Sequence, residues 1–215
     1  MENIEALTAK ARLGDVEAQY QLGMCYVRGT GVDADSALAV PWLTKAAEQG
    51  HMNAQFSLAL RYSMGDGIAQ NWVSAAFWNR KAAEQGHVVS QYSLGGSYAE
   101  GNGVEQDWNQ SFYWYKKAAD QGDADAQFVV GQNYSIGRGI QENAKEAVTW
   151  FRKSAEQNNA EAQFSLGVCL FNGDGIDQNI QEAIQWFGKA VDNGIEGEAL
   201  ELARRFLEYP KTDLR

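Results

Sequence analysis

Apolar residues recur along the chain with the spacing of amphipathic helices, and the helices that they predict come in pairs. The first apolar stripe consists of Ala18, Leu22 and Tyr26. Because these positions are four residues apart, they share one face of a helix from about residue 15 to residue 28. The second stripe consists of Ala39, Trp42, Leu43 and Ala46. It predicts another amphipathic helix, which ends near residue 50.

Glycine separates the two helices of the pair. Gly29 and Gly31 follow the first stripe, and glycine readily adopts the left-handed backbone conformation that ends a helix and turns the chain. Asp35 then offers the side-chain acceptor that is typical of a helix N-cap. Pro41 lies inside the second helix, where its ring would clash with a carbonyl group one turn earlier. We therefore expect this helix to begin late, near Leu38, or to kink.

The same pattern returns every 36 residues, with no insertion or deletion between the first and the last instance. The tryptophans of this period are Trp42, Trp78, Trp114, Trp150 and Trp186. The glycine pairs begin at Gly29, Gly65, Gly101, Gly137 and Gly173. The glutamines are Gln19, Gln55, Gln91, Gln127 and Gln163, and the lysines are Lys45, Lys81, Lys117, Lys153 and Lys189. Four columns in register exceed chance, and a fixed period of about 20 to 50 residues is typical of a repeat architecture.

We therefore predict an all-α fold, an α/α superhelix or solenoid of five helix-turn-helix repeats with a half-repeat cap at both ends. A single domain over residues 1–215 is expected to contain repeats at 14–49, 50–85, 86–121, 122–157 and 158–193. Residues 1–13 align with the end of a second helix and predict a leading cap, and residues 194–215 contain a closing first helix. One repeat cannot bury its apolar faces alone, so the neighbouring repeat must cover them.

Composition and charge narrow the class of partner. Apolar residues make up 45% of the chain and charged residues 21%, as in an ordinary folded protein, and the formal net charge is −10. A protein that neutralises phosphates needs a basic stripe, which this sequence lacks, so we expect no nucleic-acid partner. A protein or peptide partner is expected, and a basic one would be attracted by the acidic surface. The alternative is that the acidity serves only solubility.

The N-terminus and the cysteines bear on location. No apolar run approaches the roughly 20 residues of a membrane span. The first 15 residues contain no apolar stretch of the kind found in a secretory signal. Cys25 and Cys169 lie four repeats apart, too far for a disulfide, and are expected to be buried. These features predict a cytoplasmic protein without a membrane span.

Catalytic and metal-binding candidates are sparse. His51 and His87 occupy one column, and no cluster of cysteines or carboxylates completes a zinc set with them. We expect both in loops or at helix N-caps. The G-x-G pairs resemble phosphate loops, but they follow predicted helices rather than strands, and no GK[ST] motif accompanies them. No unique polar constellation breaks the repeat, so we expect no enzyme activity, no cofactor and no metal site.

The repeat resembles a known family. The segments LGMCYVRGTGV from Leu22, LGGSYAEGNGV from Leu94 and WNRKAAEQGH from Trp78 resemble the Sel1-like repeat (SLR), a relative of the tetratricopeptide repeat (TPR), over about 15–209. The resemblance implies an α/α superhelix whose first helices form a concave face, and an adaptor or scaffold role, often in bacterial complexes. Cysteine-rich relatives have a disulfide in every repeat, and some have been assigned β-lactamase activity. Those cysteines are missing here, so that activity is not carried over.

Partner-binding residues are expected in surface columns that change between repeats, because a column that never changes belongs to the scaffold. By resemblance to the tetratricopeptide pattern, an aromatic column faces the concave groove, as part core and part groove floor: Tyr20, Phe56, Tyr92, Phe128 and Phe164. Two variable columns lie four and eight residues later, on the same face of the helix. The contacts predicted in these two columns are Met24, Arg28, Leu60, Met64, Glu100, Gln132, Ile136 and Asn172. The alternative is that these residues merely vary at a solvent-facing surface.

Three functions follow from this pattern. The leading hypothesis is a protein–protein interaction scaffold that binds an extended segment or a small domain in its concave groove. The alternative is a bacterial immunity protein that occludes a cognate toxin, because an acidic surface suits a basic enzyme. A β-lactamase-like hydrolase is the third. A further surface candidate is the aromatic cluster around Trp72 and Trp108, although both tryptophans also suit a column packed under the glycine loop.

Overall fold

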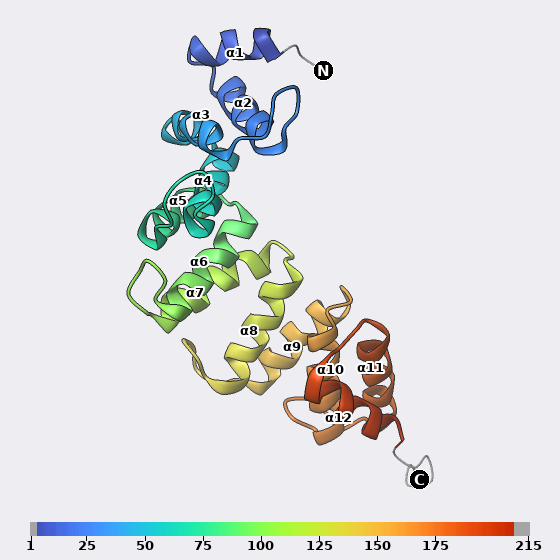
Figure 1. Ribbon diagram of the computed structural model, residues 1–215. Coiled ribbons are helices and arrows are strands. Elements are labelled where there is room, and N and C mark those ends of the chain that lie inside the picture. Colours follow the sequence, from blue (N-terminus) through green and yellow to red (C-terminus); the bar gives the residue numbers. More distant parts are fainter. Residues whose placement is uncertain (1–3, 209–215) are drawn as a thin grey trace. The chain divides into compact units, whose positions relative to one another are not determined.

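The computed structural model describes residues 4–208, and this range consists of twelve helices without a strand (Figure 1). The first six are α1 (Ile4–Arg12), α2 (Val16–Arg28), α3 (Ser36–Glu48), α4 (Met52–Met64), α5 (Trp72–Glu84) and α6 (Val88–Glu100). The other six are α7 (Trp108–Asp120), α8 (Ala124–Ile136), α9 (Ala144–Ala155), α10 (Ala160–Asn172), α11 (Ile180–Asp192) and α12 (Gly197–Leu207). The outermost parts of the two expected caps, residues 1–3 and 209–215, lie outside the described residues.

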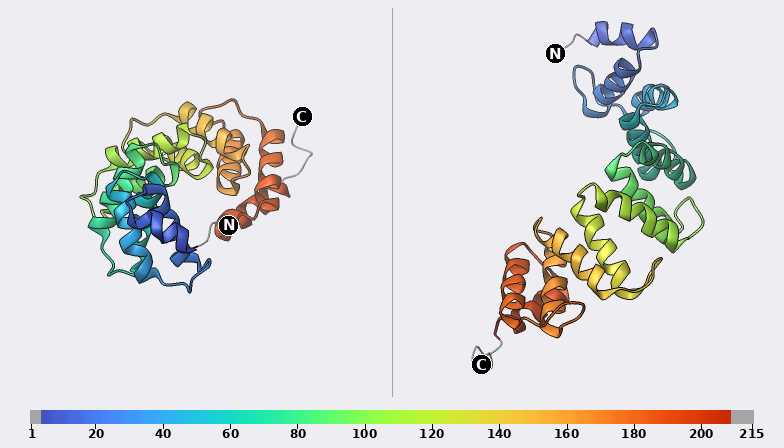
Figure 2. Two further views of the ribbon diagram at one scale, coloured as in Figure 1. Left: turned by 90° about the horizontal axis from the view of Figure 1, so that it is seen from above. Right: turned by 180° about the vertical axis from the view of Figure 1, so that it is seen from behind.

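The predicted all-α fold of five helix-turn-helix repeats is confirmed. The first helices of the repeats, called A helices below, are α2, α4, α6, α8 and α10, and the second helices, called B helices, are α3, α5, α7, α9 and α11. The lone helices α1 and α12 form the half-repeat caps. The chain divides into two compact units, of which one ends at Asp107 and the other begins at Trp108. Within each unit, every helix packs mainly on the helices before and after it in sequence (Figure 2).

Side-chain caps begin the A helices at one repeated position. Asp15, Asp123 and Asn159 each accept a hydrogen bond from the backbone N–H group three residues later. His51 and His87 occupy this position before α4 and α6. Each cap satisfies one of the backbone donors that the first turn of a helix leaves free. The expectation that the histidines lie at N-caps is therefore confirmed.

Helix α3 begins at Ser36 despite the proline in its middle. Asp35 caps the helix by accepting hydrogen bonds from the N–H groups of Ala37 and Leu38, at 2.9 and 3.0 Å. Ser36 stands in the same column as the first residues of the other four B helices. The expectation of a late start near Leu38 was therefore wrong, because the cap and the packing of the repeat outweigh the backbone hydrogen bond lost at Pro41.

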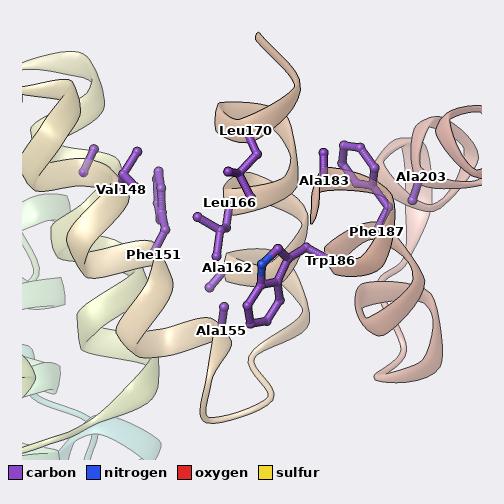
Figure 3. Packing of buried hydrophobic residues seen from close by; sticks show 11 residues of the cluster. Val148, Phe151, Ala155, Ala162, Leu166, Leu170, Ala183, Trp186, Phe187 and Ala203 are labelled. Carbon is purple, nitrogen blue, oxygen red and sulfur yellow. The ribbon is translucent and has the colours of Figure 1, made fainter. Parts of the chain in front are cut away.

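The cores of the fourth and fifth repeats each depend on a pair of a small residue and a large one. A Cβ atom added at Gly131 would lie 2.6 Å from the Phe151 ring, and one at Gly167 would lie 2.7 Å from the Phe187 ring. Figure 3 shows these two phenylalanines among the buried aliphatic residues of the second unit. The A helix therefore supplies the gap that the large side chain of its B helix fills.

From the second repeat onward, the second glycine of the G-x-G pair lies against the preceding repeat. A Cβ atom at Gly103 would overlap the backbone carbonyl group of Trp72, at the start of α5. Gly67, Gly139 and Gly175 meet the starts of α3, α7 and α9 in the same way. These glycines therefore bring two successive repeats into backbone contact, a role that is more specific than forming a turn.

A ladder of buried glutamines links each repeat to the next. In α10, Gln163 donates from Nε2 to the carbonyl oxygen of Ala155 at 3.0 Å, and its Oε1 accepts from Asn193 at 3.0 Å. Gln19, Gln55 and Gln127 make the corresponding pairs of bonds. A buried amide with both ends satisfied fixes the register of the helices that it joins.

Candidate functional site

The aromatic column of the A helices is half-buried in every repeat. Its members are Tyr20, Phe56, Tyr92, Phe128 and Phe164. In the first unit, the Tyr20 ring stacks on His51 with 4.4 Å between centroids, and Phe56 lies 4.5 Å from His87. In the second unit, Phe164 lies 5.6 Å from Phe187. These rings thus pack on a residue of their own repeat or of the next one, and they remain partly accessible.

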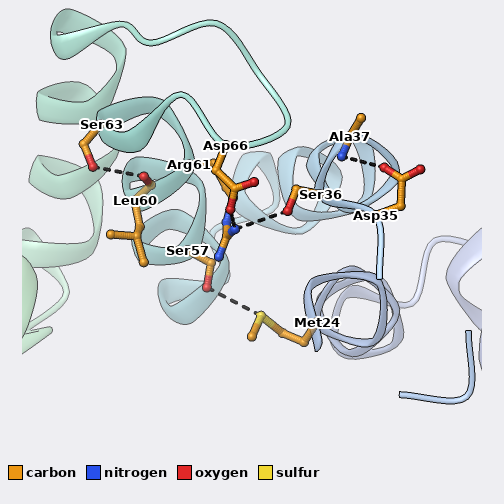
Figure 4. A network of polar contacts seen from close by, with 9 residues as sticks. All are labelled: Met24, Asp35, Ser36, Ala37, Ser57, Leu60, Arg61, Ser63 and Asp66. Carbon is orange, nitrogen blue, oxygen red and sulfur yellow. Dashed lines mark hydrogen bonds and ion pairs between the residues drawn. The ribbon is translucent and has the colours of Figure 1, made fainter. Parts of the chain in front are cut away.

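In the first unit, the variable columns expose apolar side chains beside the aromatic column. Met24 is half-buried, and its Sδ atom accepts a hydrogen bond from the Ser57 hydroxyl group at 3.8 Å (Figure 4). Leu60 is 37% exposed and Met64 is 65% exposed, on consecutive turns of α4. Because the Met24–Ser57 contact joins α2 to α4, the apolar surface runs from one repeat to the next.

Charged members of the variable columns are also exposed in the first unit. Arg28 lies at the end of α2 and Glu100 at the end of α6. The Glu100 carboxylate accepts a hydrogen bond from Asn102 at 2.5 Å. Arg28 and Glu100 stand in the same column as Met64. The apolar surface of Leu60 and Met64 therefore has a positive side chain in the preceding repeat and a negative one in the following repeat.

In the second unit, the same columns are more polar. Gln132 and Asn172 are exposed, and Ile136 is 57% exposed. Asn172 donates a hydrogen bond to Asp174 at 3.0 Å. Within each unit, the aromatic column and these exposed positions form a surface that we call the A-helix strip of that unit.

One exposed residue of the strip was not predicted from the sequence. Val89 is 49% exposed on α6. It stands three residues before Tyr92 and eleven before Glu100, so the helical period places all three on one face. Its column reads Glu17, Asn53, Val89, Asp125 and Glu161. A search of the positions before the aromatic column, as well as after it, would have found this apolar exception.

A buried arginine next to the strip belongs to the scaffold. The Arg61 side chain is 12% exposed, and its guanidinium group forms an ion pair with Asp66 and a hydrogen bond with the Ser36 hydroxyl group at 3.4 Å (Figure 4). These bonds connect α4, the loop after it and the start of α3. Arg61 therefore joins the second repeat to the first, and these bonds occupy its guanidinium group.

The histidines are occupied by structural contacts. The Nδ1 atom of His51 accepts from the N–H group of Ala54 at 3.1 Å, so the ring proton lies on Nε2, which donates to Glu17 at 3.0 Å. This hydrogen bond from His51, together with one from Gln21, lowers the pKa of the Glu17 carboxyl group. Burial lowers the pKa of His87, whose Nδ1 atom accepts from the N–H group of Ser90 at 3.1 Å.

The two cysteines are not part of a metal-ligand cluster in the described part of the chain. Cys25 and Cys169 are free, as expected, although half-buried rather than fully buried. Burial raises the pKa of Cys169 to about 11, which keeps the thiol protonated. Within residues 4–208, no three His, Cys, Asp or Glu side chains gather as metal ligands. No helix in that range has both the length and the apolar composition of a membrane span.

Trp72 and Trp108 meet the glycine loops through their backbones. Their side chains are 45% and 38% exposed. The Arg138 guanidinium group lies over the Trp108 ring, 4.5 Å from its centroid. The aromatic cluster therefore has a structural role in its main chain, and its side chains are partly accessible.

The repeats identify the family. The model of the Sel1 repeat family matches residues 16–51, 53–87, 88–123, 124–159 and 160–195. The chain belongs to the Sel1 repeat family. Proteins with Sel1 repeats generally mediate protein–protein interactions, and the fold is typically non-catalytic. The predicted resemblance to this family is confirmed.

Solved structures of other Sel1 repeat proteins are similar to this chain. The protective antigen c5321 of uropathogenic Escherichia coli, which has an SLR fold, is 36% identical with a TM-score of 0.86. The match covers 95% of this chain and 43% of that protein, so the Sel1 chain spans less than half of the antigen's length. A Sel1 repeat protein from Oxalobacter formigenes is 32% identical, with a TM-score of 0.83 over 93% of this chain and 88% of that one. No curated protein matched the chain.

Proposed function

We propose that this Sel1 repeat protein is a scaffold that binds a segment of another protein along its A-helix strip. One observation carries the proposal: Leu60, Met64 and Ile136 expose large apolar side chains in columns that change between repeats. Scaffold columns such as the Trp42 column keep one residue type throughout. The packing of the repeat requires no exposed methionine or isoleucine at these positions, so a partner supplies the reason for them.

The chemistry of the strip favours an apolar anchor on the partner. Methionine is flexible and polarisable, and it adapts to differently shaped apolar groups. Half-buried rings such as Phe56 give a rigid floor beside it. Burying an apolar side chain on Leu60 and Met64 would contribute on the order of 2 kcal/mol. An extended segment or an amphipathic helix presents such anchors at regular spacing.

Selection from a displayed peptide library tests the proposal even while the natural partner is unidentified. Peptides that bind the wild-type protein should be enriched in apolar residues. The double substitution Leu60→Ala and Met64→Ala should weaken their binding by about tenfold or more, because the loss of a central apolar contact typically costs more than 1 kcal/mol. Binding is measured by fluorescence anisotropy of a labelled peptide.

A matched control removes exposed apolar side chains elsewhere. Leu38 and Val73 are 51% and 67% exposed on B helices. Leu38→Ala with Val73→Ala should leave the binding of the selected peptides unchanged. If the selected peptides bind the Leu60→Ala, Met64→Ala variant as tightly as wild type and lose affinity for the control variant, the strip is not the binding surface.

We also propose that the chain has no catalytic role. The protonated state of the Cys169 thiol and the structural bonds of His51 and His87 support this proposal, because they keep this thiol and both imidazole rings from acting as nucleophile or base. Hydrolysis of a chromogenic β-lactam by the purified protein, abolished by a single substitution, would contradict it.

A second candidate function, that of an immunity protein, is favoured by the net charge of −10. A strongly acidic surface attracts a basic toxin and speeds the encounter. The acidic N-terminal ends of the A helices, at Glu17, Asp125 and Glu161, are exposed and would contribute to this attraction. The neighbouring genes provide the test, since an immunity protein is expected beside a reading frame for its toxin, and the absence of one counts against it.

A further inference from the structure

A cavity of about 500 Å³ in the second unit is lined by α9 and by the loop after α10, and none of its lining residues belongs to the A-helix strip. Its wall is one face of α9, with Lys145, Thr149, Arg152 and Lys153. Along the sequence, each of these residues follows the previous one by four, three and one positions, so the helical period places all four on one side of α9. The cavity is within the size range of sites for small ligands.

Its lining combines cationic groups with an apolar surface. Val148 is buried on α9 and Ile176 is half-buried in the loop after α10. Gly175 brings this loop against the start of α9, because a Cβ atom there would overlap the backbone of Ala144. The loop and the helix thus form two walls whose position is fixed by a backbone contact.

Most of the positive charge at the cavity is available. No ion pair engages the ammonium group of Lys145 or Lys153 within residues 4–208; Lys153 lies over the Trp150 ring, 4.0 Å from its centroid. Arg152 donates to the Glu182 carboxylate at 3.0 Å, and its side chain remains 35% exposed. Glu156 is the carboxylate in the lining. Three cations therefore face one lining carboxylate, and one of them shares its charge with Glu182.

Comparison of the repeats shows which part of this basic wall is particular to the fourth repeat. The column of Lys145 reads Ala37, Val73, Asn109, Lys145 and Gln181. The column of Thr149 reads Pro41, Phe77, Tyr113, Thr149 and Gln185. The column of Arg152 reads Thr44, Arg80, Lys116, Arg152 and Gly188, so the second and third repeats also have a pair of cations here. At the positions of Lys145 and Thr149, however, the second repeat exposes the apolar side chains of Val73 and Phe77. Lys153 and Gly175 recur in every repeat as scaffold, whereas Lys145 and Thr149 are not needed by the fold.

We propose that this cavity binds a small organic anion, with a phosphate or carboxylate head between Lys145, Arg152 and Lys153. The apolar body of the ligand lies on Val148 and Ile176. A local excess of positive charge in a protein with a net charge of −10 is a site where an anion is attracted rather than repelled. The Arg152 guanidinium group and the Thr149 hydroxyl group offer directional donors to the head, and the lysines offer point charges.

Titration calorimetry of the full chain at low ionic strength tests the proposal with phenyl phosphate, benzoate and inorganic phosphate. Phenyl phosphate or benzoate should bind saturably to one site, and inorganic phosphate should bind at least severalfold more weakly because it lacks an apolar body. Comparison of phenyl phosphate with benzoate separates a phosphate head from a carboxylate head. Lys145→Ala should weaken binding about tenfold, as expected for the loss of one charge-assisted contact.

The matched control is Lys117→Ala, which removes the same charge from a lysine that lies over Tyr113 and outside the cavity lining. Both lysines are exposed, so circular dichroism should show that both variants remain folded. The proposal is overturned if neither organic anion binds, or if Lys145→Ala and Lys117→Ala weaken binding equally. It is also overturned if inorganic phosphate binds as tightly as the organic anions, because the apolar wall then has no role.

Discussion

Two glycines that look alike in the sequence have different roles in the structure. Gly86 has a φ angle of 95° with no atom within 4 Å of a Cβ placed on it. Gly103 has a φ angle of 74°, and its Cβ would overlap the backbone of Trp72. Both residues adopt a left-handed backbone conformation. They differ only in that Gly103 lies close to the backbone of another segment and Gly86 does not.

Gly103→Ala should lower the free energy of unfolding strongly, by about 3 kcal/mol or more. About 1 kcal/mol comes from the left-handed conformation, and the rest from pushing apart two backbone segments that have no flexible side chain to yield. Urea denaturation followed by circular dichroism measures the change.

Gly86→Asn is the matched control, because Asn158 occupies the equivalent position with a φ angle of 67°. This variant should lose about 1 kcal/mol or less. Equal losses at Gly86 and Gly103 would show that strain, and not the contact between repeats, sets the requirement for glycine.

His87 should make the stability of the first unit depend on pH. Because burial lowers its pKa in the folded state, the unfolded chain takes up a proton first as the pH falls. Stability is therefore complete above the ordinary histidine pKa of about 6.5 and is lost between that value and the lower folded one. Urea denaturation at about pH 7.5 and about pH 5.5 should show the loss.

His87→Asp isolates this contribution. Aspartate caps the A helices at Asp15 and Asp123, so the variant keeps an acceptor for the first turn of α6. Its loss of stability over the same pH interval should be smaller than that of the wild type. An unchanged pH dependence would assign the effect to other groups.

At the scale of the helices, the glutamine ladder contributes both stability and register. Gln163→Leu keeps the volume but leaves the carbonyl group of Ala155 and the amide of Asn193 without their partner. The expected loss is about 1 to 3 kcal/mol in the free energy of unfolding, because two hydrogen bonds of about 0.5 to 1.5 kcal/mol each are removed. Urea denaturation is the measurement.

Gln181→Leu makes the same chemical change at an exposed position on α11. It should alter the free energy of unfolding by no more than about 0.5 kcal/mol. If the two variants were equally stable, the ladder would have no energetic role.

The sequence predicted the helices well because the period, the caps and the glycines repeat together. Asp35 was identified as an N-cap, and the A and B helices lie where the apolar stripes placed them. The start of α3 was mispredicted because the clash at Pro41 is local, whereas the packing that opposes it comes from neighbouring helices. The fit of Gly131 to Phe151 joins positions 20 residues apart whose complementarity appears only in three dimensions.

The surface was harder to predict than the core. On the A helices, change between repeats marks Leu60 and Met64, and both are exposed. On the B helices, the same kind of change marks Lys145 and Thr149, although neither column stands out among the other variable surface positions. The cavity itself also needs the loop at Gly175, which is distant in sequence from α9 and reaches it only through the fold.

At the scale of the whole molecule, the charge of −10 opposes folding through repulsion among carboxylates. Raising the sodium chloride concentration from about 10 mM to about 150 mM shortens the range of this repulsion and should raise the melting temperature. Surface ion pairs such as Lys116–Asp120 would be weakened, but such pairs contribute little. Differential scanning calorimetry at several salt concentrations measures the melting temperature, and a melting temperature that falls with salt would contradict the prediction.

Packing between sequence neighbours also affects how such a gene can change. Because each helix packs mainly on the helices beside it in the chain, the unit that can be copied is one repeat of 36 codons. Unequal recombination between two copies adds or removes a whole unit in frame and leaves the same kind of helix junction on both sides. The length of the array can therefore change in a single genetic event, while point mutations in the exposed columns adjust each copy separately.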